Sequence, residues 1–200
     1  MGMNIKRWIP VAAAIPAAAA LVALAATSCN TSDFERDTSP VALIVTNTTL
    51  INTIDVLGGT GCGTNTGTIN LQTIIKNPTT ITDVPINPAF NDVRITRYRV
   101  SYQRTDGGTL VPASYVNSID ILITPGGTGT GTFIVFRTDA FSQAPLAALV
   151  SGTGRDPETN RPVVRMDVIV DVFGQTLAGE NVSGSTRFPL SFCANCGGCR

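Results

Sequence analysis

Cysteine has the most specialised chemistry of the residue types in this chain, and four cysteines are candidate site residues. Cys193, Cys196 and Cys199 follow a C-x2-C-x2-C spacing, and Cys62 lies in the glycine-rich segment GGTGCGTNTG. Four thiolates are a ligand set for a zinc ion or an iron–sulfur cluster. A C-x2-C pair is also the spacing of a dithiol redox centre, and cysteines in an oxidising compartment form disulfides. The spacing alone leaves these three chemistries open.

Two features count against the metal and redox interpretations. A ferredoxin-type run needs another cysteine downstream of the third one, and this sequence stops at Arg200. The pairs Cys193/Cys196 and Cys196/Cys199 are not surrounded by a thioredoxin-like βαβ pattern. We therefore predict disulfides and no cofactor, with zinc, copper or an iron–sulfur cluster at these cysteines as the alternative.

A second group of chemically active side chains lies between positions 93 and 104. Arginine suits bidentate contacts with carboxylates and phosphates, and it stacks on aromatic rings. An anionic glycan or an envelope protein is the partner expected at such a face. The alternative without a binding function is an exposed strand face whose charges protect a sheet edge. The predicted binding face consists of Arg94, Arg97, Tyr98, Arg99, Tyr102 and Arg104.

The composition excludes several catalytic classes. The 200 residues include no histidine, which removes a Ser-His-Asp triad, a Cys-His dyad and a histidine zinc site. The 14 basic residues balance 14 acidic ones, and a net charge of zero argues against general nucleic-acid binding. No residue is assigned to catalysis, so we expect a protein that is not an enzyme.

The carboxylates give weaker signals than the cysteines. The segment Asp156–Asn160 spaces oxygens as calcium loops do, but Arg161 and Pro162 follow where a glycine is required, which favours a surface turn. Asp167 and Asp171 share one parity of an expected strand, which indicates a solvated face. An enzyme that used this pair of carboxylates would need both of them in a cleft.

The N-terminal segment has the pattern of an export signal. Lys6 and Arg7 precede an uncharged, alanine-rich run over residues 8–26, which Pro10 and Pro16 interrupt. A basic region followed by an apolar one is typical of a secretory signal peptide, and the two prolines count against a membrane-spanning helix. We expect export followed by cleavage.

The end of this run, Leu24-Ala25-Ala26-Thr27-Ser28-Cys29, resembles the lipobox of bacterial lipoproteins. That resemblance implies that residues 1–28 are removed and that Cys29 becomes the acylated first residue, anchored in a membrane. Asn30 stands where aspartate is associated with inner-membrane retention, so the resemblance favours the outer membrane. Residues 29–40 are polar and unpatterned, which predicts a tether.

Export changes what is expected of the other cysteines. With Cys29 acylated, four remain, and in an oxidising compartment an even number predicts disulfides whose pairing the sequence cannot choose. One arrangement joins Cys62 to a C-terminal cysteine and pairs the other two locally. The long bridge would stabilise the fold by about 4–5 kcal/mol on the chain-entropy model.

Short β-forming segments recur from residue 41 to the end, between clusters of glycine, proline and asparagine. The expected strands cover residues 41–46, 50–56, 68–75, 93–104, 109–111, 119–124, 132–138, 163–173 and 186–192. A helical turn or two is expected only within residues 139–150, where Pro145 limits it. Strands without intervening helices predict an all-β, antiparallel sandwich or barrel over residues 41–200.

Local patterns refine this prediction. Apolar and polar residues alternate from Val163 to Val172, and the parity of the apolar residues changes near Thr96-Arg97, which predicts a β-bulge. Asp106-Gly107-Gly108 predicts a tight hairpin. The glycine-rich segments 59–63 and 127–131 complete no phosphate-loop motif and are expected to be inter-strand loops.

Two segments resemble strands of the fibronectin type III family. Ile95–Arg104, followed by Asp106-Gly107-Gly108, resembles its third strand, with the pattern I-x-x-Y-x-V-x-Y before a hairpin. Val164–Phe173 and the turn at residues 178–183 are similar to its penultimate strand. The family's core tryptophan has no counterpart, because Trp8 lies in the signal segment. The resemblance implies an immunoglobulin-like or fibronectin type III-like sandwich with insertions.

These observations together predict a non-enzymatic lipoprotein of the bacterial cell envelope. The acyl anchor is expected to bind the protein to the membrane. Its domain is expected to be a structural, assembly or binding module stabilised by disulfides. The alternative is a metal-binding or electron-transfer lipoprotein that uses the four cysteines.

Overall fold

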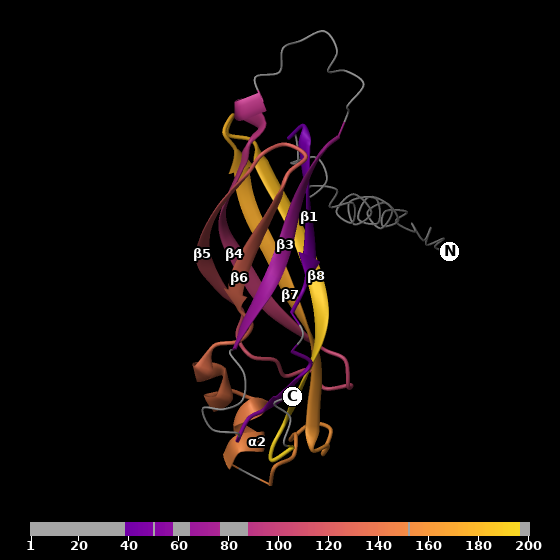
Figure 1. The fold of residues 1–200 in the computed structure, drawn as a ribbon. Coiled ribbons are helices and arrows are strands. Elements are labelled where there is room, and N and C mark those ends of the chain that lie inside the picture. Colours follow the sequence, from indigo (N-terminus) through magenta and orange to yellow (C-terminus); the bar gives the residue numbers. More distant parts are fainter. Residues whose placement is uncertain (1–38, 50, 58–64, 77–87, 152, 197–200) are drawn as a thin grey trace, which may run out of the picture. The chain divides into compact units, whose positions relative to one another are not determined.

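The computed structural model describes residues 39–49, 51–57, 65–76, 88–151 and 153–196. All of them belong to one compact unit, residues 37–200 (Figure 1). The strands are β1 (Val41–Asn47), β2 (Thr53–Asp55), β3 (Thr66–Ile75), β4 (Val93–Arg104), β5 (Tyr115–Ile123), β6 (Thr128–Ile134), β7 (Val163–Thr176) and β8 (Asn181–Cys193). Two 3-10 helices, η3 (Pro88–Asn91) and η4 (Thr138–Ser142), and one short α-helix, α2 (Leu146–Ser151), complete the described elements.

The strands form two sheets, which confirms the predicted all-β fold. One sheet has the strand order β1-β3-β6 and the other has the order β2-β8-β7-β4-β5. All neighbouring strands are antiparallel except β2 and β8, which run parallel. The expectation of a fully antiparallel arrangement is therefore corrected at β2, a three-residue strand that joins the edge of the sheet.

Side chains from both sheets share one hydrophobic core. In β7 the alternating residues Val164, Met166, Val168, Val170 and Val172 are buried, as the period-two pattern predicted. Full burial of an aliphatic side chain of this size contributes roughly 1.5–3 kcal/mol. Aromatic rings connect the two layers: a phenylalanine of β6 lies 6.1 Å, edge to face, from one ring of β4 and from one ring of β8. The three rings are those of Phe133, Tyr98 and Phe188.

The predicted bulge in β4 is confirmed. Pairing with both β5 and β7 shifts register between Ile95 and Arg97. A Cβ at Gly174 on β7 would lie 2.5 Å from the carbonyl oxygen of Arg94, so only glycine fits opposite the start of the bulge. The bulge reverses the parity of the strand, and this decides which side chains of β4 face the solvent.

Two predicted features of the chain after β4 are wrong. Residues 109–111 do not form a strand, and β5 begins only at Tyr115. Asp106-Gly107-Gly108 makes a turn, with a φ of +95° at Gly107, but a connection of residues 105–114 separates β4 from β5, so there is no tight hairpin.

The segment 127–131 was expected to be a loop, and most of it is part of strand β6. Its glycines face inward, where a Cβ at Gly131 would lie 2.7 Å from Ile121 and 2.8 Å from Ile119 of β5. Its threonines face outward and have a high strand propensity. The glycines therefore make room for isoleucines of β5. The other glycine segment, 59–63, lies outside the described residues.

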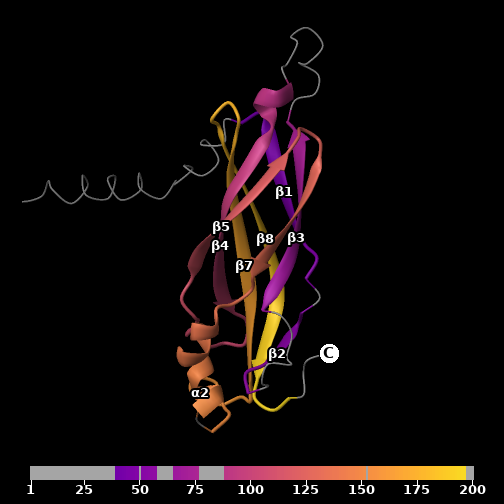
Figure 2. The same ribbon diagram turned by 60° about the vertical axis from the view of Figure 1, so that its left-hand side comes forward.

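The helical segment lies between β6 and β7 in the chain. Pro145 separates η4 from α2, so the helical stretch is divided as the sequence predicted. The ring centroid of Phe136 lies 5.0 Å from that of Phe141 in η4 and 5.9 Å from that of Phe192 in β8. Figure 2 shows α2 at the same end of the sheets as β2. Among the described residues, no helix is long and apolar enough to cross a membrane.

Candidate functional site

The six residues of the predicted binding face do not share one face. Tyr98 and Tyr102 are 3% and 8% exposed and lie in the core. The Tyr102 hydroxyl donates to the Val135 carbonyl at 2.9 Å, and the Tyr98 hydroxyl accepts from the Ile134 N–H at 3.1 Å. Burial raises the pKa of Tyr102 and keeps it neutral. The two tyrosines therefore pack in the core and bond the backbone at the end of β6, so they are not available to a partner.

Arg104 is also removed from the predicted face. Its side chain is 2% exposed, and its guanidinium pairs with two buried aspartates: Nε lies 2.7 Å from Asp106 Oδ1, and Nη2 lies 2.8 Å from Asp156 Oδ2. Glu158, nearer the surface, lies 3.5 Å from Nη1. We call Arg104, Asp106, Asp156 and Glu158 the buried ionic cluster.

The buried ionic cluster explains the Asp106-Gly107-Gly108 sequence. A Cβ at Gly108 would lie 2.5 Å from Arg104 Cζ, so the guanidinium occupies the space of a side chain. The Asp106 carboxylate also accepts the backbone N–H groups of Arg165 at 2.8 Å and Gly108 at 3.2 Å. Burial alone would raise the pKa of Asp106, but these hydrogen bonds and those from Arg104 outweigh it and lower the pKa to about 2.

The segment Asp156–Asn160 is a turn that serves this cluster. Asp156 is buried, although a surface turn was expected, and its Oδ2 accepts from the Thr159 N–H at 2.9 Å and the Thr159 hydroxyl at 2.6 Å. Burial opposes ionisation of Asp156, but the hydrogen bonds from Arg104 and Thr159 lower its pKa overall. Its other oxygen, Oδ1, has no hydrogen-bond partner within the described ranges. No group of three metal-ligating side chains that could hold a metal occurs among the described residues.

Three arginines of β4 remain on the outer face of the five-stranded sheet. Arg94 holds Asp120 of β5 through two hydrogen bonds of 2.8 and 2.9 Å. These bonds raise the pKa of Arg94 and lower that of Asp120. Arg99 lies 2.8 Å from Asp171 of β7. Arg97 has no carboxylate partner in the described part of the chain, and its guanidinium lies 5.3 Å from the ring centroid of Phe173.

The ring of Phe173 contacts two arginines of this outer face. The Arg99 guanidinium lies 5.9 Å from the same ring centroid, so one aromatic ring carries two cations. Pairing between strands places Phe173 beside Arg97 on one side and Ser183 of β8 on the other. We call Arg97, Arg99 and Phe173 the arginine platform. Phe173 was not among the predicted site residues, because the register between β4 and β7, which are far apart in the chain, decides its neighbours.

The paired carboxylates of β7 lie on the same sheet face and line no cleft that the structure describes. Asp171 pairs with Arg99, and Asp167 lies 3.5 Å from Arg187 of β8. A hollow lined by Arg94, Asp120, Leu122 and Leu177 has a volume of about 420 Å³. Neither carboxylate of β7 contributes to it.

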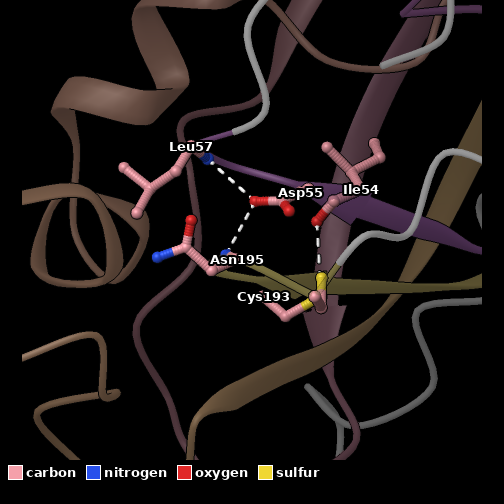
Figure 3. Close-up of a disulfide and its surroundings, with 6 residues drawn as sticks. Ile54, Asp55, Leu57, Cys193 and Asn195 are labelled. Atoms are coloured by element: carbon pink, nitrogen blue, oxygen red, sulfur yellow. Dashed lines mark hydrogen bonds between the residues drawn. A yellow bond between two sulfur atoms is a disulfide. The ribbon is translucent and has the colours of Figure 1, made fainter. Parts of the chain in front are cut away.

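Within the described residues, the C-terminal cysteines form one disulfide, between Cys193 and Cys196, with Cα atoms 5.9 Å apart (Figure 3). Asp55 of β2 accepts the backbone N–H of Leu57 and that of Asn195, each at 3.0 Å. Cys193 Sγ lies 3.8 Å from the Ile54 carbonyl oxygen. The Asp55 carboxylate of β2 therefore holds the backbone of the segment that contains the disulfide. Cys29, Cys62 and Cys199 lie outside the described residues.

Sequence parity contains a signal that separates these sites. After the bulge, Tyr98, Tyr102 and Arg104 share one parity, and Arg97 and Arg99 share the other. Neighbouring residues of a strand point to opposite faces, so the six residues cannot form one surface. Asp156, the distant partner of Arg104, has no comparable signal, because it is 52 positions away in the sequence.

Comparisons with known protein families and with curated proteins found no match to this chain.

Proposed function

We propose that this protein is a non-enzymatic, lipid-anchored protein of the bacterial cell envelope whose β-domain binds an anionic partner. The proposal for export and anchoring rests on the basic and apolar N-terminal segment and on the lipobox-like sequence that ends at Cys29. The local disulfide supports it, because disulfides persist in oxidising compartments. In this proposal the outer membrane holds the acyl chains, and residues 29–40 are the tether.

The finer fold that we propose is an immunoglobulin-like or fibronectin type III-like sandwich. Such sandwiches place the third, penultimate and last strands in one sheet, with the penultimate strand between the other two. With β2 set aside as an addition, β4, β7 and β8 have this order, and the first, second and fifth strands form the β1-β3-β6 sheet. The strands that resembled the family in sequence, β4 and β7, are the two that pair with each other.

The arginine platform is the single observation that supports binding. Arg97 presents a guanidinium without a carboxylate partner in the described part of the chain, on an aromatic ring that also carries Arg99. Arginine in this setting binds carboxylates through two parallel hydrogen bonds. The hydroxyl groups of Ser118 and Ser183 belong to residues paired with Arg97 and Phe173. An acidic glycan that carries uronate groups fits these guanidinium and hydroxyl groups.

Export and anchoring are tested by the intact mass of the protein after extraction from membranes. We expect a chain that begins at Cys29, carries acyl groups and lacks the hydrogens of four thiols, which return on reduction. Protein that keeps its first 28 residues would overturn the anchor. Four reactive thiols with a stoichiometric metal ion would overturn the disulfides and support the metal-binding alternative.

Binding is tested with a purified polyuronate, with a neutral polysaccharide as the reference ligand. We expect Arg97→Ala/Arg99→Ala to weaken polyuronate binding at least about tenfold, because it removes both cations of the platform. The matched control is Arg137→Ala/Arg155→Ala, which changes the net charge equally outside β4. Equal affinity of the two double variants would refute the platform as the binding site, and tighter binding of an acidic protein would reassign its partner.

A further inference from the structure

β5 is the outermost strand of the five-stranded sheet. One edge of β5 pairs with β4 over residues from Tyr115 to Ile123, and no described strand pairs with its other edge. Figure 1 shows β5 at the left margin of this sheet. An unpaired edge offers backbone N–H and C=O groups to another strand, so proteins usually protect it.

Other sheet edges of this domain have visible protection. At the edge of β6, two tyrosines bond the backbone of its last residue: the Tyr98 hydroxyl accepts from the Ile134 N–H, and the Tyr115 hydroxyl donates to the Ile134 carbonyl. At the opposite edge of the five-stranded sheet, β2 is only three residues long. Beside it β1 packs on β8, where a Cβ at Gly184 would lie 2.8 Å from the Leu43 carbonyl oxygen. These edges leave little room for another strand.

β5 lacks the residues that commonly protect a sheet edge, because its sequence, YVNSIDILI, contains no lysine, arginine or proline. Where its pairing with β4 shifts register, two residues of β5, Ile119 and Asp120, lie opposite Thr96 alone. Its one charge, Asp120, is held by Arg94. Val116 and Leu122, on the outer face, are each 58% exposed. The strand is nine residues long, β-prone and apolar, which is the composition of a pairing edge.

We propose that β5 pairs antiparallel with β5 of a second copy of this chain, about a two-fold axis at Ile119. In that register Val116 of each copy lies opposite Leu122 of the other, and Ser118 lies opposite Asp120. Apolar side chains thus meet apolar ones, and each carboxylate faces a hydroxyl group. An axis at Asp120 would instead place two carboxylates opposite each other. The sequence of β5 is therefore complementary to itself in one register, as a two-fold interface requires.

The pairing joins two five-stranded sheets into one continuous sheet. Because pairing over nine residues forms a small interface, the association depends on protein concentration. It leaves the arginine platform on the outer face, so two platforms lie on the same side of the joined sheet. The inference does not depend on the lipid anchor or on the anionic partner.

The test measures the mass of the full-length protein in detergent by light scattering, over a range of protein concentrations and with micelles in excess. We expect a dimer that dissociates on dilution. Val116→Lys/Leu122→Lys places two ammonium groups opposite each other at both ends of the pairing, and it is expected to raise the dissociation constant at least tenfold. Circular dichroism checks that this variant keeps its strands.

Val116→Lys/Leu122→Glu provides the register-specific rescue. It introduces as many charges as the double lysine variant, but in the proposed register each new ammonium group lies opposite a new carboxylate of the other copy, so dimers are expected to return. Ile44→Lys/Ile74→Lys, at two residues of the other sheet that are 42% and 41% exposed, should dimerise as the wild type does. A monomeric wild type, a dimer unaffected by the double lysine variant, or a failed rescue in a folded protein would overturn the proposal.

Discussion

The same two residue types, arginine and aspartate, form ion pairs in two regions of this domain with opposite exposure. In the buried ionic cluster, the side chains of Arg104, Asp106 and Asp156 are 2%, 1% and 0% exposed. On the outer sheet face, Arg187 and Asp167 form a pair in which the side chains are 55% and 21% exposed. Buried charges must be paired because water cannot solvate them, whereas exposed charges lose little when a partner is removed. The first region therefore maintains the fold, whereas the second contributes little to stability.

The largest expected effect comes from removing the central cation of the buried cluster. Arg104→Met keeps a long apolar stem but leaves Asp106 and Asp156 buried without a counter-charge. We expect the free energy of unfolding at pH 7 to fall by about 3–5 kcal/mol, because breaking a buried pair leaves uncompensated charge. Urea unfolding measures the change. The matched control, Arg187→Met, is expected to cost less than about 1 kcal/mol. Equal losses in the two variants would remove the distinction between the regions.

A smaller loss of folding stability is expected when the pH is lowered. The folded-state pKa of Asp106 is about 2, below its unfolded value of 3.8. A lowered pKa contributes stability that is present above pH 3.8 and is lost as the pH falls toward and below about 2. A difference of this size corresponds to roughly 2 kcal/mol. Asp106→Asn should lack this part of the acid dependence in urea unfolding at pH 2–6.

Arg104→Met should also change the pH dependence of stability, because without a counter-charge burial raises the pKa of the cluster's carboxyl groups. The stability gap between the wild type and Arg104→Met should therefore narrow as the pH falls from 6 to 2. A gap that stays constant over this interval would mean that the carboxylates of the cluster are not the source of the destabilisation.

The smallest expected effect concerns the exposed pair. In a double-mutant cycle with Arg187→Ala and Asp167→Ala, we expect a coupling energy below about 1 kcal/mol. The coupling should weaken with added salt, because charges in contact with water are screened over about 10 Å at 0.1 M ionic strength. A coupling energy of several kcal/mol that salt leaves unchanged would place this pair with the buried cluster.

Strand β4 shows how far the sequence could predict these two regions. Its bounds, Val93–Arg104, and its bulge were both predicted, because the parity of its apolar residues changes once. The same parity separates Arg97 from Tyr98, yet a shared residue chemistry suggested one binding face. Periodicity within a strand is therefore a better guide to which side chains share a face than their chemical similarity.

The segment 127–131 shows a different limit. Glycine-rich sequences usually form turns, but the glycines of β6 are in a strand because isoleucines of β5 fill the space beside them. Similarly, residues 109–111 have the composition of a strand, but Glu158 accepts the backbone N–H groups of Thr109 and Leu110, each at 2.8 Å, which a sheet neighbour would otherwise use. Contacts that are distant in the sequence override local propensity in both places.

The all-β class, the inward face of β7 and the bulge in β4 follow from local patterns in the chain, because side-chain alternation is a property of consecutive residues. Three features become visible only in the folded domain: Arg104 is buried with Asp106 and Asp156, Arg97 and Arg99 share Phe173, and β5 lies at an edge. These features depend on strand register and on pairing between residues far apart in the chain. Long-range packing sets both, and no local pattern encodes them.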